Sequence, residues 1–373
     1  MKFGASFALS SALFPASTNY LKAVKDHGKI QENRNPANAR ILGSSILPSA
    51  PRQKHGKRQK LETRSTRQEY RISSNRLIRP SSAVARISRE FRGEAIALAA
   101  QAQQVTLPLE KGSVRFAVIG DSGTGGRLQY ETAQQLEPTE QKFSFEFILM
   151  MGDNLYGSKT PRDFESKFEV PYKPLLDSGI KFYASLGNHD IPDEQSYKPF
   201  NMDGHRYYSF KKGRVRFFAL DSNYMDPDQL KWLENQLQAA TEDWKIAFFH
   251  HPLYSSGAKH GSATELRGLL EPLFVKYGVR IVFSGHDHVY ERIQPQKGIY
   301  YFTEGSSGQL RRGDARGASF TAKAFDEGCA FMVIEVTPDE ATFQTISRAG
   351  VTVDSGMIQR SASQPQGTAG HHP

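Results

Sequence analysis

Five apolar segments in the second part of the chain are each followed by a short polar segment. The apolar segments cover residues 114–120, 145–151, 181–186, 244–249 and 279–283. Nearly continuous apolar character predicts strands that are buried on both faces. The polar segments are Gly-Asp-Ser-Gly at 120–123, Gly-Asp-Asn-Leu-Tyr at 152–156, Gly-Asn-His-Asp at 187–190, His-His-Pro at 250–252 and Gly-His-Asp-His at 285–288. Ligands bind at the carboxyl ends of strands in open α/β sheets, so these segments are expected to converge on one site.

The remaining patterns indicate the fold class. Helical patterns lie between the strands, at residues 163–176, 228–240 and 263–277. Residues 207–210 and 215–220 flank a polar turn and predict a hairpin. Further strand-like runs follow at 299–303, 330–336 and 341–347. Strands that alternate with helices, followed by an all-strand end, predict an α/β domain with mixed sheets.

The positive charge of the chain is concentrated at its N-terminal end. Residues 1–110 contain 19 Lys and Arg against 7 Asp and Glu, whereas the remainder contains 29 against 32. Low hydrophobicity combined with like charge predicts a disordered basic tail over residues 1–110, a catalytic domain over 111–360 and a flexible tail over 361–373. The basic run 53–60 would suit nucleic acid or an anionic surface, but it contains no aromatic residues, which favours a solvated tail.

The compartment of the protein stays open at this level. Residues 1–17 and 95–102 each resemble part of an export signal, and neither match is good. Nothing in the chain is a run of 18 apolar residues, so no membrane-spanning helix is expected. The single cysteine, Cys329, excludes an internal disulfide, and its apolar neighbours at 330–334 predict a buried thiol.

The side chains in the five polar segments are metal ligands by type. Carboxylate, imidazole and amide oxygen suit hard or borderline divalent and trivalent metals. Two Asp, one Asn and three or four His are too many for one tetrahedral zinc, and they suit two ions that share a carboxylate. A lone Gly-Asp after a strand is often only a turn. Five such segments in this order, each after a predicted strand, favour a dinuclear metal site.

The segments resemble those of the calcineurin-like metallophosphoesterase superfamily, and within it the purple acid phosphatases of the tartrate-resistant type. The resemblance covers roughly residues 114–350. Most of the superfamily has Asp-x-His in the first motif, where this chain has Gly123. The purple acid phosphatases take a tyrosine three residues after the Asp of the second motif, and Tyr156 has that spacing from Asp153.

The resemblance implies a four-layer α-β-β-α sandwich of two mixed sheets, and two metal ions. The first ion would be Fe(III), because a phenolate favours it, and the second would be divalent iron, zinc or manganese. Asp153 would bridge them. The resemblance gives the first ion the ligands Asp121, Asp153, Tyr156 and His288, and it gives the second Asp153, Asn188, His250 and His286.

The expected reaction is hydrolysis of small phosphate monoesters by an acid phosphatase. The two ions would lower the pKa of a bound water, and the hydroxide formed would attack phosphorus. By resemblance, His189 and His260 are the substrate-side histidines, and either can protonate the leaving oxygen. A packing or solvent-facing role is expected for His251 and His205. Arg292 is expected to support the last motif or to pack, and residues 305–309 are candidates for the pocket border.

Two other functions stay open. The first is a phosphodiesterase or nucleotide hydrolase that uses the same dinuclear site. The second is a nucleic-acid-binding or surface-binding protein that acts through the basic tail, with a degenerate metal domain. The complete set of ligand positions argues against the second, so a small phosphate ester rather than a specific nucleic acid is the expected partner. Oligomeric state cannot be predicted from these patterns.

Overall fold

The computed structural model describes residues 106–360, which contain two mixed β-sheets. The six-stranded sheet has the order β13-β12-β11-β1-β2-β3 and the seven-stranded sheet has the order β10-β8-β9-β7-β6-β5-β4. The strands are β1 (Val114–Ile119), β2 (Phe147–Met150), β3 (Lys181–Ala184), β4 (Tyr208–Lys212), β5 (Val215–Ala219), β6 (Trp244–Phe248), β7 (Ile281–Ser284), β8 (Tyr290–Ile293), β9 (Tyr300–Glu304), β10 (Thr321–Phe325), β11 (Ala330–Val336), β12 (Glu340–Ser347) and β13 (Thr352–Gln359).

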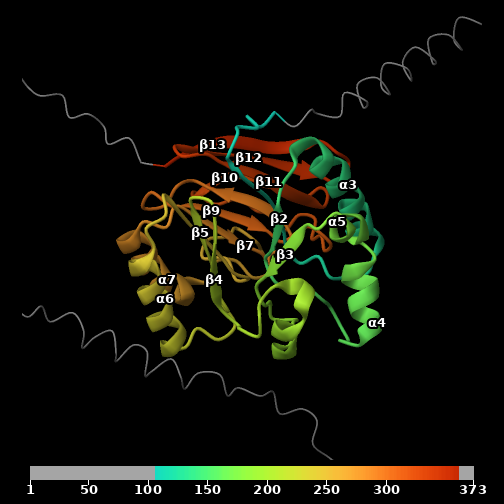
Figure 1. Ribbon diagram of the computed structural model, residues 1–373, viewed down its shortest axis with the longest axis horizontal. Coiled ribbons are helices and arrows are strands. Elements are labelled where there is room, and N and C mark those ends of the chain that lie inside the picture. The colour runs from blue at the N-terminus through green and yellow to red at the C-terminus, as the bar shows by residue number, and fades with distance from the viewer. Residues whose placement is uncertain (1–105, 361–373) are drawn as a thin grey trace, which may run out of the picture. The chain divides into compact units, whose positions relative to one another are not determined.

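Helices cover the outer faces of the sheets and complete four layers. The helices are α3 (Arg127–Phe143), α4 (Pro161–Phe164), the π-helix η1 (Glu165–Glu169), α5 (Lys173–Asp177), the 3-10 helices η2 (Pro192–Ser196) and η3 (Lys198–Phe200), α6 (Pro227–Ala239) and α7 (Thr264–Tyr277). In Figure 1, α6 and α7 lie together on one side of the strands, and α3, α4 and α5 lie on the other. The α-β-β-α sandwich expected from the resemblance is therefore confirmed.

Alternation of side chains along the strands divides the core into three clusters. Phe116 and Val118 of β1 point toward the other sheet and pack with Phe217 and Phe283 between the two sheets. Their neighbours Ala117 and Ile119 point outward, into a cluster that includes Leu136 of α3 and Leu175 of α5. A third cluster joins the outer face of the second sheet to α6 and α7. Each sheet is thus buried on both faces, as the continuous apolar segments predict.

Some elements differ from the sequence-based expectations. The helix predicted over residues 163–176 is divided into α4, η1 and α5. Strands β8, β10 and β13, and the 17-residue helix α3, were not predicted. Helix α3 buries the polar residues Gln129, Thr132 and Thr139 and contains Pro138, so its sequence lacks a clear apolar period. Strand β13 has one buried residue, Ile358, and its other residues are half-buried or exposed, so it lacks the apolar run typical of a buried strand.

Several sequence-based expectations concern residues outside the five polar segments. Cys329 is buried, as expected for a structural thiol. Glu335 of β11 accepts hydrogen bonds from the backbone N–H groups of Leu109 and Glu110, at 2.7 and 2.6 Å, which ties the start of the described chain to the first sheet. The candidate export segments and the basic run 53–60 lie outside the described residues. Within those residues, no helix has the length and apolar character needed to cross a bilayer.

The carboxyl ends of the parallel strands lie against one another across the two sheets. Strands β1, β2 and β3 run parallel in the first sheet, and β6 and β7 run parallel in the second. Asp121, which follows β1, donates its backbone N–H to the carbonyl of Gly152 at 3.1 Å. Its carboxylate Oδ2 accepts the backbone N–H of His286, after β7, at 2.8 Å. The segments after the strands of both sheets therefore form one surface.

Close backbone approach at this surface requires glycine. A Cβ atom placed on Gly187 would lie 2.2 Å from both the backbone nitrogen and the Oδ1 of Asp153. Such a contact is far inside van der Waals distance, and one of the partners is backbone that cannot rotate away. The segments after β2 and β3 can therefore approach this closely only with glycine at position 187.

We expect Gly187→Ala to lower the free energy of unfolding by about 1–3 kcal/mol, because an overpacked site must shift backbone. The matched control is Gly268→Ala in α7, where an added Cβ meets no atom within 4 Å. That substitution should stabilise the protein slightly, since alanine is the better helix former. Urea unfolding followed by circular dichroism measures both changes. A Gly187→Ala protein as stable as the wild type would contradict the close approach.

Candidate metal centre

Three of the predicted ligand atoms form a compact triangle at the end of the first sheet. The phenol oxygen of Tyr156 lies 3.1 Å from Asp121 Oδ1 and 3.2 Å from His288 Nε2. His288 Nε2 lies 3.4 Å from the same Asp121 oxygen. Gly123 is close by, and a Cβ there would lie 1.8 Å from the carbonyl oxygen of Asn154. The structure thus leaves no room for a histidine at position 123, and Tyr156 occupies the site instead.

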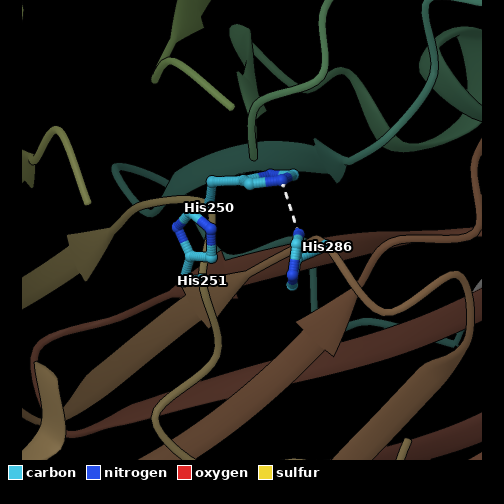
Figure 2. A group of neighbouring side chains, drawn as sticks. All are labelled: His250, His251 and His286. Carbon is cyan, nitrogen blue, oxygen red and sulfur yellow. Dashed lines mark hydrogen bonds between the residues drawn. The ribbon is translucent and has the colours of Figure 1, made fainter. Parts of the chain in front are cut away.

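The other predicted ligands form a second group centred on His250. Its Nε2 lies 2.9 Å from Asn188 Oδ1, 3.0 Å from His286 Nδ1 and 3.5 Å from Asp153 Oδ1. Figure 2 shows His250 and His286 pointing toward each other, with His251 beside them. The ligand atoms of Asp121, Asp153 and His288 also lie within 4.8 Å of one another, so Asp153 adjoins both groups.

The hydrogen bonds around His250 leave lone pairs that face each other. His250 Nδ1 lies 2.9 Å from the carbonyl oxygen of Met151, which can only accept, so this nitrogen carries the proton. The Nε2 atom is then a lone pair, and it faces the oxygens of Asn188 and Asp153, which also only accept. A cation between them resolves this repulsion. The orientation through a backbone carbonyl is also the usual support for a metal-bound histidine.

The spacings within both groups fit ligands of a single ion. Metal–ligand bonds of about 2.0–2.2 Å place neighbouring ligand atoms roughly 3–3.5 Å apart. The distances among Asp121, Tyr156 and His288, and those from His250 to its three neighbours, lie in that range or just below it. The residues present therefore fit two metal ions.

Burial makes the carboxylate of Asp121 unfavourable without a positive charge. Burial, and then the nearby charge of Asp153, raise the pKa of Asp121 well above its usual range. Burial acts to raise the pKa of Asp153 as well, but the charge of His250 and the backbone N–H of His189 outweigh it, so that this pKa is lowered. Burial, followed by the charges of both carboxylates, also raises the pKa of Tyr156. A metal ion would supply the missing counter-charge.

His286 and His288 are held neutral, which is the form that binds metal. Burial and then repulsion from His250 lower the pKa of His286 to about 2. Burial and the positive charge of Arg311 lower the pKa of His288 to about 3. Both imidazoles therefore present free lone pairs over the whole range of pH in which the protein is expected to work.

Three of the ligand residues have backbone conformations that are rarely seen outside glycine. The φ angles of Asp121, Asp153 and His286 are 52°, 51° and 72°. Each such residue costs of the order of 1–3 kcal/mol, and such residues cluster at functional sites. The conformation turns the chain sharply after each strand, so that the side chain points into the site.

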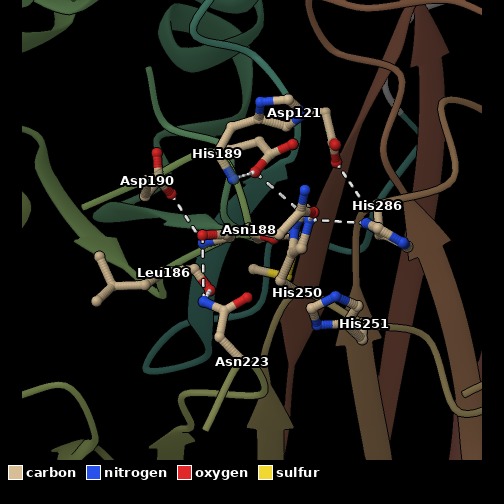
Figure 3. A network of polar contacts seen from close by, with 12 residues as sticks. Asp121, Leu186, Asn188, His189, Asp190, Asn223, His250, His251 and His286 are labelled. Carbon is tan, nitrogen blue, oxygen red and sulfur yellow. Dashed lines mark hydrogen bonds and ion pairs between the residues drawn. The ribbon is translucent and has the colours of Figure 1, made fainter. Parts of the chain in front are cut away.

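Asp190 is a half-buried anchor that sequence reasoning missed as a supporting residue. Its carboxylate accepts hydrogen bonds from the backbone N–H groups of Asn154, Leu155 and Gly187, at 3.1, 3.1 and 2.8 Å. Figure 3 shows this carboxylate beside the segment that carries Asn188 and His189. Asn223 supports the segment from the other side by donating to the carbonyl of Gly187 at 3.1 Å. Asp190 thus locks the segments after β2 and β3 together, and its place in the Gly-Asn-His-Asp motif was the available signal.

A cavity of about 350 Å³ opens over the two ligand groups. It is lined by Asp153, Tyr156, Asn188, His189, Lys259, His260, His286, His288, Gln309, Leu310 and Arg311. His189 and His260, the two predicted substrate-side histidines, both line it and are exposed. The His189 ring centroid lies 4.8 Å from that of Tyr156, and the His260 centroid lies 4.2 Å from that of His286. The two imidazoles thus flank the ligand groups at the cavity mouth.

The structure also gives positions for the other residues considered in the sequence, which are His251, His205, Arg292 and the segment 305–309. His251 bonds Ser222 Oγ through Nδ1 at 2.9 Å, and its ring lies 4.4 Å from that of His286, so it packs beside the site. His205 is exposed and lies in a separate hollow. Arg292 is paired with Asp354 of β13 at 2.7 Å. Of the segment 305–309, Gln309 lines the cavity.

Comparisons with known proteins agree with this geometry. Residues 114–290 match the family model of the calcineurin-like phosphoesterases. The chain is 28% identical over 309 residues to tartrate-resistant acid phosphatase type 5 of Oryctolagus cuniculus, which covers 69% of this chain and 95% of the relative. It is 27% identical to purple acid phosphatase 7 of Arabidopsis thaliana, over 67% of this chain and 88% of the relative.

The fold is also found in solved structures. The structure of GAP50, the anchor in the inner membrane complex of Plasmodium, superimposes with a TM-score of 0.59 and 21% identity, over 68% of this chain and 90% of that one. At this identity the likeness concerns the fold alone. Residues 114–290 thus form a calcineurin-like phosphoesterase domain whose curated relatives are purple and tartrate-resistant acid phosphatases, and the chain is a metal-dependent phosphoric ester hydrolase.

Proposed function

We propose that the protein hydrolyses phosphate monoesters with two metal ions that share Asp153. The first ion is held by Asp121, Asp153, Tyr156 and His288. The second is held by Asp153, Asn188, His250 and His286. The observation that carries the proposal is the position of the Tyr156 phenol oxygen, within 3.2 Å of both Asp121 and His288. A tyrosine held there has no packing role that would require its oxygen to face a buried carboxylate.

The character of Tyr156 favours ferric iron at the first position. Burial and two nearby carboxylates raise the pKa of its phenol, so a strongly charged cation is needed to displace the proton. A hard, anionic phenolate stabilises a trivalent ion better than a divalent one. The second group lacks a tyrosine and combines two imidazoles with amide and carboxylate oxygens, which suits divalent iron, zinc or manganese.

The bound ions would activate water and balance the charge of the phosphate. The protein residues orient the substrate and manage protons. The His189 backbone N–H donates to Asp153 Oδ1 at 2.9 Å, which fixes the start of the segment that carries the imidazole. His260 is held across the cavity on the loop before α7. Because both imidazoles are exposed at the mouth, where the alcohol part of an ester would leave, either can donate a proton to the leaving oxygen.

The cavity favours monoesters over diesters. Lys259 and Arg311 both line it, and a monoester carries two negative charges where a diester carries one. The wild-type protein should therefore hydrolyse p-nitrophenyl phosphate with a higher kcat/KM than bis-p-nitrophenyl phosphate. Release of p-nitrophenol measures both reactions. Faster turnover of the diester would contradict the monoester assignment and leave the dinuclear site intact.

The iron-loaded protein should be violet or pink, because a phenolate bound to ferric iron absorbs visible light. Tyr156→Phe should remove this band, and an absorption spectrum with metal analysis measures the loss. Tyr277→Phe is the control, since that phenol, at the end of α7, donates to Glu234 of α6 at 2.9 Å and does not line the cavity. A colourless, active protein that contains only zinc or manganese would overturn the assignment of iron.

His189→Ala and His260→Ala should each lower kcat for an alkyl phosphate such as glycerol 2-phosphate by about 10²–10⁴-fold if that imidazole donates the proton. The loss should be much smaller for p-nitrophenyl phosphate, whose leaving group needs no proton. His205→Ala, in the separate hollow, is the control and should leave both rates unchanged. Equal losses on both substrates would argue against proton donation.

A further inference from the structure

One wall of the cavity is positively charged, and its charged residues belong to neither of the two metal-ligand groups. It is formed by Lys259 on the loop before α7 and by Arg311 on the segment after β9. The backbone N–H of Arg311 donates to the carbonyl of His288 at 3.0 Å. Arg311 is thus attached directly to a proposed metal ligand, and its side chain lines the space into which a substrate must enter.

The guanidinium of Arg311 is incompletely paired. Its Nη1 atom is buried, and it has no hydrogen-bond partner in the described part of the chain. The nearest carboxylate oxygen, Asp314 Oδ2, lies 3.5 Å away, which is too far for a good hydrogen bond, and this oxygen also lacks a hydrogen-bond partner. This long ion pair faces away from solvent and gives Nη1 no hydrogen bond, whereas the side chain as a whole is partly exposed and Arg311 lines the cavity.

Two loops hold this wall in place. Gly257 forms an isolated antiparallel bridge with Ala315, and the backbone N–H of Ala258 donates to the carbonyl of Asp314 at 2.9 Å. On the other side, the buried Asp287 accepts hydrogen bonds from Ser255 Oγ at 2.6 Å and from the backbone N–H of Gly261 at 3.2 Å. The loop with Lys259 is therefore fastened to the segment with Arg311, and the two cations belong to one preformed wall.

Positive side chains outnumber carboxylates in the cavity lining. Asp153 is the one carboxylate among the residues that line the cavity, and it faces the proposed metals. An anion placed beyond the reacting phosphate would thus meet Arg311 and Lys259, and no carboxylate of the lining would oppose it.

We propose that Arg311, assisted by Lys259, is a specificity residue that binds a second anionic group on the alcohol part of the substrate. The substrate class is then phosphate monoesters whose alcohol carries a carboxylate or a second phosphate. Arginine suits this role because its planar fork binds either group through two hydrogen bonds. This inference rests on the proposed phosphomonoesterase function, and it adds the chemical class of the substrate.

The test compares three esters on the metal-loaded full chain. Glycerol 2-phosphate is the reference without a second anion, 2-phosphoglycerate adds a carboxylate, and 2,3-bisphosphoglycerate adds a further phosphate. Wild-type kcat/KM should be highest for the anion-bearing esters. Arg311→Gln should lower the ratio of their kcat/KM to that of the reference by about tenfold or more, as expected for loss of a charge-assisted pair. The ester that loses more identifies carboxylate or phosphate as the preferred group.

The neighbouring Arg312 provides the control, since it is exposed and does not line the cavity. Arg312→Gln should leave all three kcat/KM values unchanged, and Arg311→Lys should keep part of the preference. Equal losses on all three esters in Arg311→Gln would overturn the proposal, because Arg311 would then act on the reacting phosphate that the three esters share or support the fold. If Arg312→Gln lowered the preference for the anion-bearing esters as much as Arg311→Gln does, the proposal would also be overturned, because general surface charge would then explain the preference.

Calorimetry separates this inference from the proposed function. If the wild-type protein hydrolyses none of the three esters, the proposed function fails, but binding can still be measured by titrating each ester into the metal-loaded chain. Tighter binding of 2-phosphoglycerate than of glycerol 2-phosphate, abolished in Arg311→Gln, would support the anion subsite by itself. Equal binding of the two esters to the wild type would overturn it.

Discussion

The site depends on the electrostatic problem posed by two buried carboxylates at the end of one sheet. Asp121 and Asp153 are almost completely buried, and Asp153 raises the pKa of Asp121 in addition to the effect of burial. Two backbone N–H groups and the Tyr156 phenol donate to them, but in the described part of the chain no lysine or arginine lies within ion-pair distance of either carboxylate. Such an arrangement is unfavourable as a set of protein groups alone, and it becomes favourable when cations occupy the centre. Bound metal ions would therefore stabilise the folded domain.

The fold makes this arrangement possible by bringing the ends of strands from two sheets together. Backbone hydrogen bonds join Asp121 to Gly152 within the first sheet and join Gly285 to His250 within the second. Side chains then join the sheets, since the Asp121 carboxylate accepts the backbone N–H of His286. Positive φ angles at three ligand residues and glycines at the points of closest approach allow the bends. Local strain at the ligands is offset by the large core between and outside the sheets.

Much of the fold and of the ligand set could be predicted from sequence because both have short-range signals. Continuous apolar runs marked the central strands, and a polar segment after each strand marked the candidate ligands. Helix α3 lacked such a signal because it buries glutamine and threonine, and β13 lacked one because its residues, apart from Ile358, are half-buried or exposed. Arg311 could not be found in this way either. Its importance arises from a backbone bond to His288, 23 positions earlier in the chain, and from a loop that folds back beside it.

An anomalous-scattering crystal structure of the metal-loaded protein would show whether two ions share Asp153. Two anomalous peaks about 3.5–4 Å apart, with Asp153 between them, are expected. One peak should lie within bonding distance of Tyr156 and the other within bonding distance of His250. A single peak, or two peaks without Asp153 between them, would contradict the shared-carboxylate centre.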